Sequence, residues 1–255
     1  MTYTPFNPDT IHFLPTQIII TVVLWFITYK IARKVQEKRQ KEENTDLAVQ
    51  LRNTFIVMAL TITLVASGFL SAVILGEFRE YYRFSLPAGY ALLIVANLLF
   101  YYFSLNLYEL NKNRLIIVGF AFLVVLILVL LPCNYYGVPS ELYDPGTSCR
   151  FISNVALVGA SFIVYSDIAW RAFRIAKRAK ERLPTTSFTL IGLSACFLIL
   201  FLIMLTIDAL LIDMGSDGYT AFLHVGYLSI IGFAVSSYAG LLMPPWIRKY
   251  LVEVR

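Results

Sequence analysis

Charged residues are scarce in this chain, and so are cysteine and histidine. Of its 255 residues, 15% are charged, three are cysteines and two are histidines, while 58% are hydrophobic. A soluble domain has about 25% charged and roughly 45–50% apolar residues, so this chain has too few polar groups to cover a folded surface in water. The composition excludes a soluble enzyme, a disordered protein and a secreted disulfide scaffold, and it predicts an integral membrane protein.

The apolar residues are gathered in seven runs, each close to the ~20 residues that a helix needs to cross a bilayer. These runs lie at about 12–32, 54–75, 86–108, 115–132, 151–170, 187–212 and 219–243. Because the connections between them are short, we predict one domain over residues 1–255, an all-α bundle of seven transmembrane helices.

Lysine and arginine fall almost entirely on one set of connections. Eighteen of the 21 basic residues lie there, and the other set holds only Arg79, Arg83 and Arg150. Cytoplasmic loops carry the excess of basic residues in membrane proteins. We therefore predict a multi-pass protein of the cell (plasma) membrane with its N-terminus outside and its C-terminus in the cytoplasm. The net charge of +5 then reflects topology, and we expect no nucleic-acid partner.

Two of the three cysteines stand at the ends of one predicted external loop. A Cys133–Cys149 disulfide would close a loop of about 15 residues and contribute roughly 3 kcal/mol to stability; the alternative is two free thiols. Cys196 lies inside the sixth run and is expected to be a packing residue. No cysteine or histidine spacing matches a metal site, so we predict no metal.

Polar side chains recur at helical spacing inside three of the runs. Such residues usually face the bundle interior or a cavity, because polar groups are costly in the bilayer. Two interpretations remain open: hydrogen bonds between helices, or a polar cavity for a ligand. The residues are Tyr90, Asn97, Tyr101, Ser104 and Tyr108 in the third run, Asn154, Ser161 and Tyr165 in the fifth, and His224, Tyr227 and Tyr238 in the seventh.

Asp208 and His224 lie near the external ends of consecutive runs, which makes them candidate neighbours. A carboxylate beside an imidazole favours a charged pair, and this pair serves either as a structural salt bridge or as part of a ligand or proton site. His12 lies at the same level. The predicted external pocket is lined by Tyr90, Asn97, Asn154, Asp208, His224 and Tyr227.

A basic stretch follows the fifth run. It predicts that the helix continues past the membrane with arginines recurring every three or four residues, namely Arg171, Arg174, Arg178 and Arg182. Asp167 stands four residues before Arg171, a favourable ion-pair spacing. These arginines are expected to bind anionic lipid headgroups or to dock a cytoplasmic partner.

The motifs of several membrane-protein classes are missing. Neither paired intramembrane aspartates nor a serine–histidine pair in a glycine-rich setting is present, and no glycine-rich phosphate loop occurs. A retinal protein needs a lysine in the seventh helix, and residues 218–248 contain none. The third run is followed by ELNKNR and the seventh reads SSYAGLLMPPW, unlike the signatures of animal G-protein-coupled receptors. We therefore expect no enzyme activity, no retinal and no cofactor.

The plan of the chain, and its exit sequence MPPWIRKYL, resemble the seven-helix sensor modules at the N-terminus of some prokaryotic membrane histidine kinases. This resemblance implies a sensor. The chain departs from the family pattern, because no kinase or other output domain follows before Arg255. Three explanations stay open: a stand-alone receptor-like protein, a signalling partner supplied in trans, or a fragment of a larger sensor.

The sequence thus favours a receptor or sensor that reads an external small ligand, or the state of the membrane, and signals to a cytoplasmic partner. A small transporter or channel is the second interpretation, and a lipid-modifying membrane enzyme is the third.

Cysteines introduced at Gln40 and Ser140 check the predicted topology. A membrane-impermeant thiol reagent applied to intact cells is expected to label position 140 but not position 40, because the two positions belong to loops on opposite sides. Labelling of position 40 from outside would contradict the whole loop assignment.

Overall fold

The computed structural model of the chain describes residues 5–41, 44–134, 150–214, 220–244 and 249. Two short 3-10 helices, η1 (Pro8–Thr10) and η2 (Pro132–Asn134), accompany seven α-helices. The α-helices are α1 (Phe13–Gln40), α2 (Asp46–Leu75), α3 (Glu80–Leu107), α4 (Asn113–Val129), α5 (Arg150–Arg178), α6 (Arg182–Asp213) and α7 (Ala221–Leu242).

Each α-helix overlaps one of the predicted apolar runs, so the predicted all-α bundle is confirmed, and its composition is that of a membrane protein. In the part of the chain that the structure describes, six helices are long and apolar enough to cross a bilayer, and α4 is the shorter seventh with 17 residues. At 1.5 Å per residue, α4 is about 25 Å long, slightly less than a typical hydrocarbon core.

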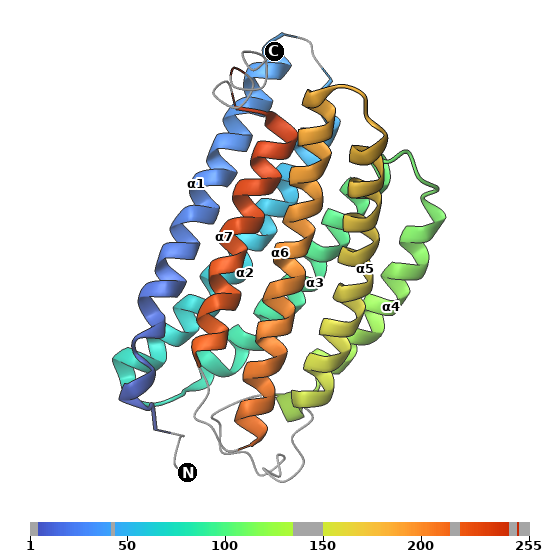
Figure 1. Cartoon of the computed structure of the whole chain (residues 1–255). Helices are drawn as coiled ribbons and strands as arrows, with labels where there is room; N and C mark the ends of the chain where they lie inside the picture. The colour runs from blue at the N-terminus through green and yellow to red at the C-terminus, as the bar shows by residue number, and fades with distance from the viewer. Residues whose placement is uncertain (1–4, 42–43, 135–149, 215–219, 245–248, 250–255) are drawn as a thin grey trace.

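The helices form a closed bundle (Figure 1). Helices that follow one another in the chain pack together, and α7 packs back against α1. α3 also contacts α5, and α4 covers both of them at one edge of the bundle. As a result, α7 packs between α6 and α1, although α1 lies far from both in the sequence.

The two ends of the bundle differ in charge. We call the end where α1 and α7 begin the distal end, and the end where they stop the basic end. The α3–α4 and α5–α6 connections also lie at the basic end (Figure 1). This end carries Lys34, Lys38, Lys41, Lys112, Arg114, Arg174, Lys177, Arg178 and Arg182.

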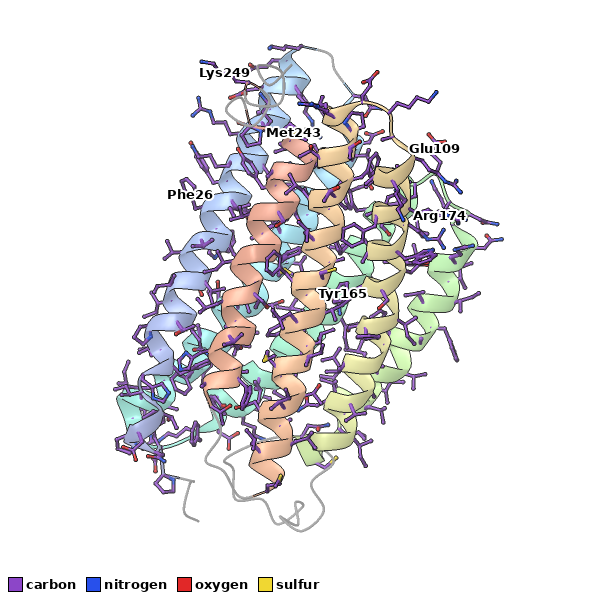
Figure 2. The ribbon with its side chains drawn as sticks, in the orientation of Figure 1. Phe26, Glu109, Tyr165, Arg174, Met243 and Lys249 are labelled. Carbon is purple, nitrogen blue, oxygen red and sulfur yellow. The ribbon has the colours of Figure 1, made fainter. Side chains whose placement is uncertain are left out.

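Aromatic side chains fill the middle of the bundle. Phe233 of α7 stacks on Phe55 of α2 at 5.3 Å between ring centroids and meets Phe100 of α3 edge-on at 5.5 Å. Tyr165 of α5, which Figure 2 shows midway along the bundle, lies 6.3 Å from Phe100. All four side chains are at most 1% exposed, so four helices share one tightly packed centre.

The outward faces of the helices are apolar as well. On α4 the side chains of Ile116, Ile117 and Phe120 are 69–73% exposed, and on α1 Val22 and Phe26 are 61% and 58% exposed. Large apolar surfaces of this kind would be unstable in water and are expected in contact with lipid.

The basic stretch after the fifth run is divided between two helices, which corrects one prediction. α5 ends at Arg178, and Arg182 is the first residue of α6. A single continuous helix is disfavoured by Pro184, which has no N–H to donate to the carbonyl group of Lys180 and whose ring would clash with it. In the first turn of a new helix the same proline is well tolerated.

α2 and α3 approach closely at Gly68. A Cβ atom at this position would lie 1.9 Å from Oγ and 2.8 Å from Cβ of Ser85. Helices in membranes commonly use small residues in this way to bring their backbones together.

Gly68→Ala is therefore expected to destabilise the bundle by about 1–3 kcal/mol, the usual cost of an extra methyl group in a packed interior. Thermal unfolding in detergent measures this effect. Gly119→Ala is the matched control, because a Cβ there meets no atom within 4 Å, and it should not lower the melting temperature. Equal stability of the two variants would contradict the close approach of α2 and α3.

Candidate functional site

Side chains from the start of α1 surround His224 of α7 at the distal end. The hydroxyl oxygen of Thr16 and Nδ1 of His224 are 3.0 Å apart, and the His12 and His224 rings are 5.0 Å apart. The ring of Phe13 meets His224 edge-on at 5.1 Å. His224 therefore forms part of the contact between α1 and α7.

Asp208 of α6 holds the beginning of α7. Its Oδ1 accepts hydrogen bonds from the backbone N–H of Thr220, at 2.9 Å, and from the Thr220 hydroxyl, at 2.8 Å. Thr220 is the N-cap residue of α7, and a carboxylate is favourable near the positive end of a helix dipole. Asp208 is 4% exposed, so this link between α6 and α7 is well shielded.

Asp208 and His224 lie near each other, as predicted, but each is hydrogen-bonded to a threonine. His224 lies within electrostatic range of both Asp208 and His12. The hydrogen bonds of the two residues, however, run to Thr220 and Thr16. The sequence predicted that the two residues lie at the same level of consecutive helices. It did not predict their hydrogen-bond partners, Thr220 and Thr16.

Tyr227 lies one turn deeper on α7 and is buried. Its ring meets Phe13 edge-on at 5.0 Å, and the side chain of Gln17 lies close to its hydroxyl. Tyr90 and Asp208 are within electrostatic range of the same hydroxyl. Tyr227 therefore connects residues of α1, α3, α6 and α7.

Gln17 carries an unsatisfied acceptor at this point. The side chain is 1% exposed, and its Oε1 atom is buried without a hydrogen-bond partner. A buried polar atom left unpaired costs about 1–3 kcal/mol. A bound N–H or O–H donor at this position would remove that cost.

Tyr90 and Asn154 lie at a separate small cavity between α3 and α5. The cavity has a volume of about 10 Å³ and is also lined by Asn134 and Ser153. Such a space holds about one water molecule. It is too small for an organic ligand without movement of the helices.

Asn97 is hydrogen-bonded across the same two helices at greater depth. Its Nδ2 donates to Oγ of Ser161 at 2.9 Å, and the Tyr165 hydroxyl donates to its Oδ1. All three side chains are at most 1% exposed. This network is the hydrogen-bonding link between helices that the polar stripes on the third and fifth runs predicted.

The six residues of the predicted pocket therefore fall into three groups, and two contributing residues were missed. Thr16 and Gln17 lie in the first apolar run. Two adjacent polar residues after a proline are the sequence signal that could have identified them. The groups are Asp208, His224 and Tyr227 at the contact of α1, α6 and α7, Tyr90 and Asn154 at the small cavity, and Asn97 in the α3–α5 network.

At the basic end, Arg171 forms the predicted ion pair with Asp167, with 2.7 Å between nitrogen and oxygen. Arg174, Arg178 and Arg182 are exposed, and Figure 2 shows Arg174 near the basic end of α5. These three guanidinium groups are accessible from outside the bundle.

The predicted disulfide lies partly outside the described residues, because these do not include Cys149, and it stays a prediction. Cys196 is a free, half-buried thiol of α6. Within the described part of the chain, no group of three or more histidine, cysteine, aspartate or glutamate side chains is placed to hold a metal ion.

Comparisons of the chain with protein-family models, with curated proteins and with solved structures give no match. The class to which the protein belongs is therefore defined by its fold: a membrane-type helical bundle with six long apolar helices and a shorter one.

The role of Asp208 as a cap can be separated from its charge. Asp208→Leu removes both hydrogen bonds to Thr220 and is expected to lower the free energy of unfolding by about 1–3 kcal/mol. Asp208→Asn keeps an acceptor oxygen and should cost clearly less. Thermal unfolding of both variants measures the difference, and equal losses would show that the cap is not what Asp208 contributes.

Proposed function

We propose that this protein is a receptor or sensor of the plasma membrane. It reads a small ligand, or the state of the membrane, at the distal end and signals to a cytoplasmic protein at the basic end. In this proposal the N-terminus is outside and the C-terminus is cytoplasmic, in keeping with the basic residues gathered at one end. A cytoplasmic signalling protein is the proposed partner, in keeping with the resemblance to histidine-kinase sensor modules.

The observation that carries the proposal is the unpaired acceptor of Gln17 beside Tyr227. It lies between α1 and α7, among groups that favour a cationic or hydrogen-bond-donating ligand: Asp208, His224 and two tyrosines. A ligand that binds between two helices stabilises one relative position of those helices over another.

α7 connects this site to the basic end. It begins beside Asp208, packs through Phe233 against the centre of the bundle, and ends at Leu242. Packed helices shift as rigid rods by about 1–2 Å in many switching proteins. A shift of α7 relative to α1 at the distal end is therefore transmitted to the basic end.

The exposed arginines at the α5–α6 connection suit an acidic surface of a partner. Arg174, Arg178 and Arg182 all lie there, and guanidinium groups bind carboxylates in a bidentate manner. Anionic lipid headgroups offer the same chemistry and remain the alternative partner for these residues.

The rival proposal is a small transporter or channel, which needs a polar path between the two ends. The packed rings of Phe55, Phe100 and Phe233 fill the middle of the bundle, which favours sensing. A lipid-modifying enzyme ranks third. Catalysis, a cofactor, retinal and nucleic acid have no place in the proposal.

Protons serve as the test ligand, since histidine side chains change charge between pH 5 and 8. Spin labels at Gln40 and Lys249 report the separation at the basic end in a reconstituted Cys196→Ala background. Lowering the pH from about 7.5 to about 5.5 is expected to change this separation by about 2 Å. The reason is that a charge gained by the His224 ring acts at the contact of α1 and α7, where the centroid of the His12 ring is 5.0 Å away.

A His12→Gln/His224→Gln variant is the control, and its distance should not respond to pH. An unchanged distance in the unsubstituted protein would contradict transmission through α1 and α7. Rapid proton flux into proteoliposomes would favour the transporter instead.

A further inference from the structure

The basic end contains a cleft that the proposed function does not use. It lies between α1, α6 and the end of α7, with a volume of about 520 Å³. This volume is in the range of small-molecule binding sites. Its lining residues are Lys34, Glu37, Lys38, Lys41, Leu183, Pro184, Ser187, Phe188, Leu241, Leu242 and Met243.

One wall of the cleft is positively charged. Lys34, Lys38 and Lys41 follow one another at steps of four and three residues, so they lie on one face of α1. Among the described lining residues, Glu37 is the one acid, and it pairs with Lys34 at 3.2 Å. Three ammonium groups against one carboxylate leave a net attraction for an anion.

The opposite wall is apolar. It is made by Leu183 and Phe188 of α6 and by Leu241 and Leu242 at the end of α7. Met243, which Figure 2 shows where α7 stops, adopts φ 40° and ends the helix. A free inorganic anion gains nothing from such a wall, whereas an amphiphile with an anionic head fits both sides.

A second cleft on the other side of α7 is a weaker candidate. It shares Lys38, Leu241 and Leu242 with the first, but its own charged residues are Asp46 and Lys112, which offset each other.

We propose that the cleft between α1, α6 and α7 binds the phosphate headgroup of an anionic phospholipid. The lysines of α1 hold the phosphate, and the glycerol and upper acyl carbons lie against the apolar wall. The site stands at the ends of membrane-length helices, the level at which headgroups are found. Basic residues at this level attract anionic lipids. A bound lipid would link the three helices that also build the distal site.

Native mass spectrometry of the full-length protein, released from nanodiscs, tests this site. The discs contain phosphatidylcholine with about 10% phosphatidylglycerol, and the readout is the phosphatidylglycerol retained per protein. Lys38→Gln/Lys41→Gln is expected to weaken retention about tenfold. The matched control is Arg39→Gln/Arg114→Gln, which removes the same charge from exposed residues outside both clefts and should change retention less than twofold.

Equal losses in the two variants would overturn the proposal, because they would mean general attraction to the basic end. If phosphatidylcholine is retained as strongly as phosphatidylglycerol, the proposed preference for an anionic headgroup is wrong. Inorganic phosphate at about 10 mM should leave retention unchanged, and complete displacement would assign the site to free phosphate instead.

Discussion

The structure depends on how polar side chains are satisfied in surroundings that offer neither water nor a hydrophobic drive for helices to associate. Lipid tails are as apolar as leucine, so helices in a bilayer are held by close packing and by hydrogen bonds between them. Asn97, Ser161 and Tyr165 supply such bonds between α3 and α5, and Gly68 supplies close packing between α2 and α3. The aromatic centre around Phe233 then fixes α7 against the rest of the bundle.

The same requirement explains why the distal site is distinctive. The polar groups there have protein partners, including buried Asp208 with Thr220 and half-buried His224 with Thr16. Gln17 is an exception, because its Oε1 atom is buried and unpaired. Since α1 and α7 meet at this point and again border the cleft at the basic end, one helix pair joins the two proposed binding sites. We infer that ligand and lipid act on the same pair.

Much of the fold could be predicted because hydropathy is a local property. Each apolar run became one α-helix, and the i, i+4 spacing of Asp167 and Arg171 became an ion pair. The division of the arginine stretch was missed, although Pro184 was its visible cause. The candidate site was predicted in part. Asp208, His224 and Tyr227 do lie at the contact of α1, α6 and α7. Tyr90, Asn97 and Asn154 make other contacts, because the rotation of a helix about its axis is set by its neighbours.

The sequence by itself determined that the chain is a membrane-type bundle of seven helices, since the length of an apolar run and the absence of charge within it require no knowledge of partners. It also determined that one end is basic. Only the tertiary structure decided that α7 closes against α1, which brought Thr16 and Gln17 beside His224 and Tyr227. It likewise decided that lysines of α1 face the end of α7 across a cleft. Contacts between helices some 200 residues apart arise from packing of the whole bundle, which no local pattern in the chain encodes.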